Sequence, residues 1–149
     1  MKRLISTGLA AALLASAVPL AAQSMPGSTL ASQAGFGRAL ALGGADLLVG
    51  EPFNETTPGM VHIYRKVAGK WAESGSLHAT DANNSDGFGY ALATSGNLLL
   101  VAANRADANK GAAYIFTRDT RGNWSQVARL SAADGAASEN YGTFVALGD

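Results

Sequence analysis

The sequence contains no cysteine in its 149 residues. Without thiols the chain can form no disulfide, no zinc–thiolate or iron–sulfur centre and no cysteine nucleophile. Its two histidines, His62 and His78, belong to no His-x-His or His-Glu-x-x-His motif and have no acid beside them, so the sequence predicts no catalytic zinc site. Basic and acidic residues number 11 each, and no basic cluster stands out, which argues against nucleic-acid binding.

Outside its N-terminus the chain also lacks any sustained helical periodicity of apolar residues. Short apolar segments at 38–42, 47–49, 60–65 and 71–77 are instead separated by turn-forming Gly, Pro and Asn. Short strands between turn signals of this kind indicate an all-β fold.

The N-terminus has the order of a targeting segment. Lys2 and Arg3 precede an apolar run over residues 4–20, and small residues follow at Ala21-Ala22. We interpret residues 1–22 as a signal peptide. The run is also close to membrane-spanning length, so an uncleaved anchor is the alternative. Both interpretations export the rest of the chain, to a secreted, periplasmic or cell-surface location, with no membrane span left after cleavage. The small, polar residues 23–33 are interpreted as a linker.

The most informative feature is an internal repeat of 52–53 residues. The matching pieces are Phe36-Gly37, Phe88-Gly89 and Tyr141-Gly142, then Leu47-Leu48-Val49 with Leu99-Leu100-Val101, Trp71 with Trp124, and Asp81 with Asp134. A fixed period of this length indicates a repeat architecture. We assign repeat 1 to residues 34–85, repeat 2 to 86–138 and the start of a third to 139–149. Since stacked repeats generally need three or more units, we expect a truncated chain, completed by further blades or by a homo-oligomer that closes a ring.

The strand at 60–65 is apolar on both sides. Val61 and Ile63 face one way, and Met60, His62 and Tyr64 face the other, with His62 expected between neighbouring sheets. A half-exposed strand would alternate apolar and polar residues. A strand covered on both faces is typical of a β-propeller blade, which packs between two others.

Together these pieces resemble the FG-GAP repeat, the blade unit of the β-propeller in integrin alpha subunits and in many exported proteins. The Phe-Gly pairs carry the first part of the motif, and Gly50-Glu51-Pro52 carries the second, which weakens to Ala102-Ala103-Asn104 in repeat 2. The resemblance implies blades of four antiparallel strands, here two full blades and the first strand of a third. Some members bind calcium between the first two strands. That place holds only the tight turns at 43–46 and 94–97, which cannot supply six to eight oxygen ligands, so no calcium site is predicted.

Several acidic residues and their neighbours are candidate ligands for an ion or for a partner's basic group. Asp107 and Asn109 form half a calcium-loop pattern, but Lys110 lies inside it and repeat 1 lacks it, so we interpret a surface loop. The acidic pairs Asp81/Asp86 and Asp134/Glu139 could flank an ion or a partner's basic group. We expect instead that their aspartates bond nearby backbone amides. Glu51 is unrepeated and, as a single carboxylate, has no acid–base partner in the sequence.

Other recurring residues are interpreted as structural. Phe36, Phe88 and Tyr141 are expected to be equivalent anchors buried between blades, each followed by a glycine that permits close backbone approach. Trp71 and Trp124 recur at one strand position, which favours packing. Three Asn-x-Ser/Thr triplets begin at Asn54, Asn83 and Asn123.

The sequence therefore predicts an exported, non-catalytic β-propeller scaffold whose loops bind a protein or carbohydrate partner. It assigns no catalytic, cofactor-binding or metal-binding residue. Two alternatives remain open. The chain could be the propeller part of a secreted enzyme whose catalytic residues lie elsewhere, or a short repeat protein that closes a ring by oligomerising.

Overall fold

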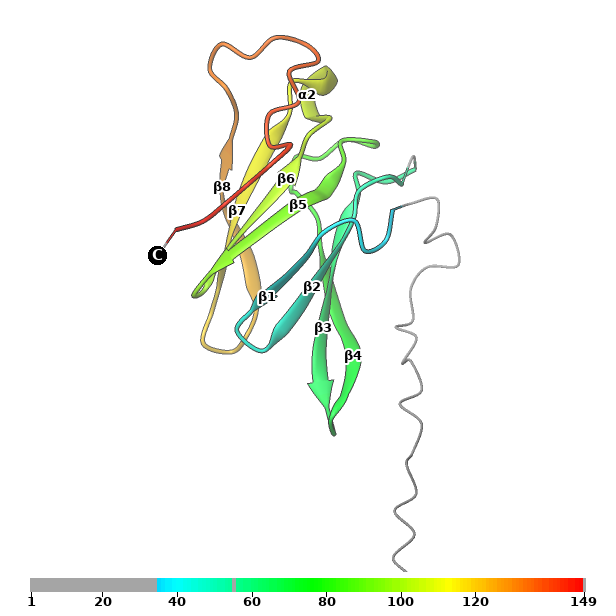
Figure 1. Ribbon diagram of the computed structural model, residues 1–149, viewed down its shortest axis with the longest axis vertical. Helices are drawn as coiled ribbons and strands as arrows, with labels where there is room; N and C mark the ends of the chain where they lie inside the picture. Colours follow the sequence, from blue (N-terminus) through cyan, green and yellow to red (C-terminus); the bar gives the residue numbers. More distant parts are fainter. Residues whose placement is uncertain (1–34, 55, 149) are drawn as a thin grey trace, which may run out of the picture.

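The structure is a computed structural model that describes residues 35–54 and 56–148; the predicted signal peptide and linker lie outside this part of the chain. The described residues form eight strands and one four-residue helical turn (Figure 1). In chain order they are β1 (Leu40–Gly43), β2 (Asp46–Glu51), β3 (Met60–Val67), β4 (Lys70–Leu77), β5 (Phe88–Ser95), β6 (Leu98–Ala103), α2 (Ala106–Asn109), β7 (Ala112–Arg118) and β8 (Trp124–Leu130).

The strands form two four-stranded sheets, each with its strands in sequence order and all pairs antiparallel. The predicted all-β class and the four-stranded antiparallel units are therefore confirmed. One irregularity of the strand register repeats as well, while the shift between Phe88 and Leu92 in β5–β6 has no counterpart in β1–β2. The β3–β4 register shifts between Ile63 and Tyr64, and the β7–β8 register shifts at the matching place, between Ile115 and Phe116.

The two sheets pack face to face around a shared apolar core. Sheet β1–β4 contributes Leu48, Val61, Ile63 and Leu77, and sheet β5–β8 contributes Phe88, Leu99, Val101, Tyr114 and Phe116. Residues 61–64 on β3 are buried on both faces of the sheet, as the sequence predicted for that strand. Burial of these side chains is the main source of cohesion between the sheets.

Glycines permit the closest approach between the sheets. Gly89 has a φ of +92°, and a Cβ added there would lie 2.6 Å from the carbonyl oxygen of Met60. A side chain at Gly50 would likewise collide with the backbone of Gly89. A parallel bridge joins Gly59 to Phe88 at this junction, and an equivalent bridge joins Gly111 to Tyr141. The prediction that the glycine after each aromatic residue permits close backbone approach is thus confirmed at Gly89.

The three expected aromatic anchors differ in burial. Phe88 is fully buried, Phe36 is half-buried and Tyr141 is 39% exposed, so the prediction that all three are buried is correct for Phe88 alone. Phe88 lies between two complete sheets. Tyr141 reaches the second sheet through its bridge to Gly111 and has no sheet of its own. The predicted first strand of a third blade is also absent from residues 142–148. In both sheets the equivalent strand pairs with the strand that follows it, whereas no strand of the described part of the chain pairs with residues 142–148.

The two ends of the sheets carry different connections. Short turns join β1 to β2, β3 to β4, β5 to β6 and β7 to β8 at one end, and Figure 1 shows these turns pointing downward. The longer segments 52–59, 78–87, 104–111 and 131–140 emerge at the opposite end, which we call the long-loop end. These four longer segments therefore share one end of the molecule.

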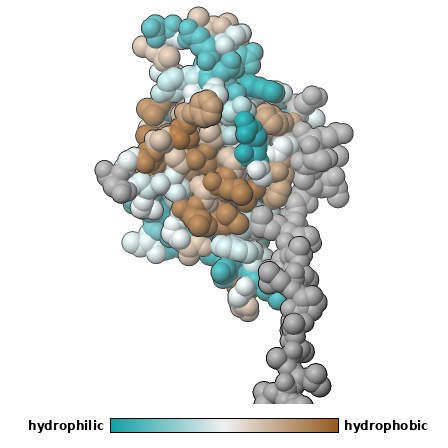
Figure 2. All heavy atoms as spheres, viewed as in Figure 1, coloured by the Kyte–Doolittle hydropathy of each residue, from teal (hydrophilic) through white to brown (hydrophobic). Residues whose placement is uncertain are grey.

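An apolar surface remains exposed beside the first strands. Leu40 and Leu42 on β1 are 61% and 66% exposed, and Phe144 in the C-terminal segment is 92% exposed. Figure 2 shows apolar side chains gathered on the side of the molecule where β1, β5 and the C-terminal segment lie. Exposed apolar side chains gathered on one side are typical of surfaces that contact another chain or domain.

Candidate functional site

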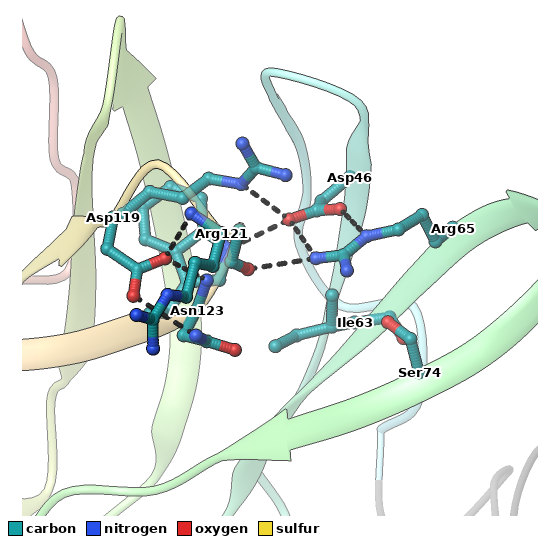
Figure 3. A network of polar contacts seen from close by, with 10 residues as sticks. Asp46, Ile63, Arg65, Ser74, Asp119, Arg121 and Asn123 are labelled. Carbon is teal, nitrogen blue, oxygen red and sulfur yellow. Dashed lines mark hydrogen bonds and ion pairs between the residues drawn. The ribbon is translucent and has the colours of Figure 1, made fainter.

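A buried aspartate connects the two sheets at the short-turn end. Asp46, at the start of β2, is fully buried, and its Oδ1 accepts a 2.6 Å hydrogen bond from Nε of Arg65. Its Oδ2 accepts hydrogen bonds from Arg65 at 3.0 Å and, across the interface, from Arg118 at 2.9 Å and Nε1 of Trp124 at 3.0 Å. Arg65 also donates to the carbonyl of Gly122 in the β7–β8 turn, as Figure 3 shows. We call Asp46, Arg65, Arg118 and Trp124 the inter-sheet clamp.

The electrostatics of the inter-sheet clamp favour the charged form of Asp46. Burial by itself would raise the pKa of this carboxyl, but the hydrogen bonds from Arg65, Arg118 and Trp124 outweigh burial, so its pKa lies below the usual value. The same contact raises the pKa of Arg65. In the clamp, the charged Asp46 therefore pairs with two arginines. Its bonds from Arg118 and Trp124 fix how one sheet lies on the other.

The turn that supplies Gly122 is itself held by an aspartate. Asp119 accepts backbone hydrogen bonds from Arg121 and Asn123 and a side-chain bond from Asn123 (Figure 3). These bonds lower the pKa of Asp119. The one-residue insertion of repeat 2 lies in this turn, and the turn contributes to the interface.

A second polar group lies on the outer face of the first sheet. His62 contacts Glu51 through Nε2 and Glu73 through Nδ1, both at 2.8 Å, and the ring of Phe36 packs 5.2 Å away. The expectation that His62 and Glu51 lack acidic or basic partners was wrong. Glu51 and Glu73 are 11 residues from His62 in opposite directions along the chain, and only strand pairing brings them together. The matching positions of the second sheet hold Ala103, Tyr114 and Gln126, so the repeat alone gives no signal for this contact.

Two acidic residues of the long-loop end, Asp81 and Asp107, pair with the same arginine. Arg129 on β8 pairs with Asp81 at 3.1 Å, with Asp107, and with the hydroxyl of Tyr114. Asp86 is buried, and its carboxylate accepts a 2.7 Å hydrogen bond from the backbone amide of Asn83. Burial raises the pKa of Asp86, although this hydrogen bond opposes the shift. The predicted bonding of these aspartates to backbone amides is confirmed for Asp86, whereas Asp81 forms an ion pair.

The other acidic candidates have structural partners or lie on the surface. Asp107 and Asn109 belong to a left-handed turn, with φ between 52° and 65° at residues 107–109, and Asp107 is used by Arg129. Glu139 accepts a hydrogen bond from the backbone amide of Ala136, while Asp134 is exposed. No group of three or more metal-ligating side chains is found in residues 35–54 and 56–148.

Four side chains form a ladder at the long-loop end, next to the first strands. The guanidinium of Arg38 lies 4.4 Å from the ring centre of Tyr90, that ring lies 6.0 Å from Phe53, and Arg105 lies 5.1 Å from the ring of Phe53. We call this set the arginine–aromatic ladder. Both arginines are exposed and both rings are half-buried. Sequence reasoning missed this group. The signal was available, because Arg38 and Tyr90 occupy one position of the repeat, and Phe53 and Arg105 occupy another.

The remaining predicted residues occupy simple surroundings. Nζ of Lys66 lies 5.2 Å from the ring centre of Trp71 on the outer face of the first sheet, whereas Trp124 belongs to the inter-sheet clamp. The two equivalent tryptophans therefore make different contacts. His78, Asn83 and Asn123 are exposed, and Asn54 is half-buried. No helix in the described part of the chain has the length and hydropathy to cross a bilayer.

Comparison with known proteins agrees with this geometry. A search of curated proteins finds no match to this chain. The family model of the FG-GAP repeat matches residues 71–116, about a third of the chain. The matched stretch begins within β4 and ends within β7, so it takes the last strand of one sheet with the first three of the next. FG-GAP repeats form β-propeller-like modules for protein interaction and are typically non-catalytic and extracellular. The chain thus carries an FG-GAP repeat, as the sequence motifs predicted.

Proposed function

We propose that this protein is an exported, non-catalytic β-propeller scaffold that binds a protein partner through its long-loop end, with a carbohydrate as the alternative class of ligand. The observation that carries the proposal is the one-sided placement of connections. Four segments of eight to ten residues emerge at one end, whereas short turns close the other. Loops on a rigid sheet scaffold are the usual carriers of binding, because they vary without loss of the core.

The two sheets support this role by holding the loops in fixed positions. The loop at 104–111 is tied to the one at 78–87 by a hydrogen bond from the amide of Arg105 to the carbonyl of Asp86. The amide of Ser85 donates in turn to the carbonyl of Thr57 in the 52–59 loop. Loops fixed in this way lose little conformational entropy when a partner binds.

Site-specific photo-crosslinking in the exporting cell tests this proposal. A photoreactive residue at exposed Asn84 or Lys110 samples the long-loop end, and one at exposed Ala68 or Thr120 samples the short turns as a matched control. We expect a discrete protein adduct from the first pair alone. Adducts from the short turns, or none from the long-loop end, would contradict the proposal.

We also propose that residues 1–22 direct export and are removed. N-terminal sequencing of the protein recovered outside the cytoplasm checks this, and a chain that begins at Met1 would refute it.

A further inference from the structure

The arginine–aromatic ladder spans the boundary between the two repeats in a regular way. Each repeat contributes one arginine and one aromatic residue, in exchanged positions. Arg38 and Phe53 come from the first repeat, and Tyr90 and Arg105 come from the second. Both cation–ring contacts therefore cross from one repeat to the other. Each such contact contributes modestly to stability at an exposed site, and together they hold both guanidinium groups in place.

The backbone beneath the ladder is fixed by hydrogen bonds. The amide of Arg38 donates to the carbonyl of Gly35 at 3.0 Å, and the amide of Tyr90 donates to Gly87 at 3.1 Å. Gly35 has a φ of +77°, and the ring of Phe53 occupies the space that a side chain there would need. The four side chains thus project from anchored backbone on both repeats, and the site is largely organised before any ligand arrives.

The two exposed arginines of the ladder differ from the half-buried arginines of the molecule. Arg65, Arg118 and Arg129 each pair with a carboxylate. Neither Arg38 nor Arg105 forms an ion pair with another described residue. A guanidinium that lies over a ring uses its flat face, and its N–H donors point outward along its edges, in the arrangement that binds a carboxylate through two hydrogen bonds.

We propose that the arginine–aromatic ladder is the binding site for an acidic peptide segment of a partner protein, in which two carboxylates flank an apolar side chain. The carboxylates bind Arg38 and Arg105, and the apolar side chain packs against the exposed edges of Phe53 and Tyr90. This inference rests on the proposed function, because it names the partner chemistry for one part of the long-loop end.

Two observations favour a peptide over other anions. A sugar stacks on an open ring face, and here a guanidinium lies over each ring. The same end of the molecule also carries the exposed acids Asp81, Asp107, Asp134 and Glu139, which repel a densely charged polyanion more strongly than a ligand with two local carboxylates.

Titration of the isotope-labelled full chain, followed by NMR, tests the proposal. The probe is the peptide Gly-Glu-Leu-Glu-Gly, and its neutral counterpart Gly-Gln-Leu-Gln-Gly is the control ligand. We expect the Nε–H signals of Arg38 and Arg105 to shift and saturate with the acidic peptide and to stay unchanged with the neutral one. Equal responses to both peptides, or no response at these two arginines, would overturn the proposal.

Matched variants locate the site. The double variant R38Q/R105Q should weaken binding at least about tenfold, since two charge-assisted contacts are lost. R121Q makes the same change at an exposed arginine in the β7–β8 turn and should alter affinity less than about twofold. Equal losses would show that net charge alone attracts the peptide. Should the double variant melt early, R38Q and R105Q singly provide the same comparison.

A third ligand separates peptide from carbohydrate. An oligogalacturonate of matched charge should bind more weakly than the acidic peptide, and tighter binding would refute the peptide assignment. If the ladder fails these tests while crosslinks from Asn84 or Lys110 persist, the proposed function stands and only this inference falls.

Discussion

The two sheets have similar backbone arrangements and differ in their polar side chains. Both sheets have the same strand order, and the register shift of β3–β4 recurs in β7–β8. The first sheet has Asp46 where the second has Leu98, and it has Glu51, His62 and Glu73 where the second has Ala103, Tyr114 and Gln126. What repeats is therefore the glycines and apolar side chains that build a sheet. The unrepeated polar side chains determine which surface each sheet presents to its neighbour.

One pair of equivalent positions shows how the difference arises. Arg118 and Trp124 are cross-strand partners and reach Asp46 on the other sheet. Lys66 and Trp71 are the same partners on the first sheet, and they stack on each other at its outer face. A basic residue paired with a tryptophan thus forms an interface where a carboxylate faces it and a surface contact where none does.

The largest expected difference in stability is the one between the alanine variants of Phe88 and Phe36. Phe88→Ala removes a fully buried ring between the sheets and should lower the free energy of unfolding by about 3–5 kcal/mol. Phe36→Ala removes the half-buried equivalent and should cost clearly less. Chemical denaturation of both full-length variants measures the difference. Equal losses would show that the two anchors are equally enclosed in solution.

Removal of the clamp carboxylate should have the next largest effect. Asp46→Asn leaves Arg65 and Arg118 facing a neutral group inside the interface and should cost about 2–4 kcal/mol, since both arginines are partly exposed. Asp119→Asn, in the exposed turn, is the matched control and should cost less. A neutral result for Asp46→Asn would mean that the sheets do not depend on the clamp.

The pH dependence of the same variant gives an independent measurement. Because the pKa of Asp46 is lowered in the folded state, its contribution to stability is present above the unfolded pKa of about 3.9 and is lost as pH falls through the lower folded value. The stability difference between the native chain and Asp46→Asn should be full near pH 6 and should shrink below about pH 4. A difference that grows in acid would contradict the assigned direction.

Replacing residues of the first sheet by their equivalents in the second tests the contacts of His62 with Glu51 and Glu73. Glu51→Ala leaves Nε2 of buried His62 without its carboxylate and should cost about 1–3 kcal/mol. The triple variant E51A/H62Y/E73Q installs the residues of the second sheet and should recover most of that loss, because a buried polar group can be replaced by well-packed side chains. A triple variant less stable than Glu51→Ala would show that the first sheet requires its own polar group.

The smallest effect concerns the two tryptophans. Trp124→Phe removes the indole hydrogen bond to Asp46 and should cost about 0.5–1.5 kcal/mol. Trp71→Phe keeps a ring for Lys66 and should be close to neutral. Thermal melting of the two variants side by side checks this order, and the reverse order would disprove the assignment of Trp124 to the clamp.

The sequence predicted the sheets well because their causes are local. Short apolar segments, turn-forming Gly, Pro and Asn between them and the 52–53-residue period indicated four strands in each unit, and Phe88 and Gly89 behave as expected. The polar contacts were missed because they depend on register and packing. Nothing near Asp46 in the sequence indicates Trp124, 78 residues away, and Glu51 meets His62 only once β2 pairs with β3.

The long reach of the inter-sheet clamp also bears on folding kinetics. Within each sheet every strand pairs with its neighbour in sequence, so the chain closes only short loops as a sheet forms. The bonds from Arg118 and Trp124 to Asp46 close loops of 72 and 78 residues and require both sheets to be in place. Contacts that form after the rate-limiting step change the unfolding rate and leave the folding rate nearly unaltered. Because the clamp requires both sheets to be in place, we expect it to form after the rate-limiting step, so that Asp46→Asn raises the unfolding rate and leaves the folding rate nearly unchanged.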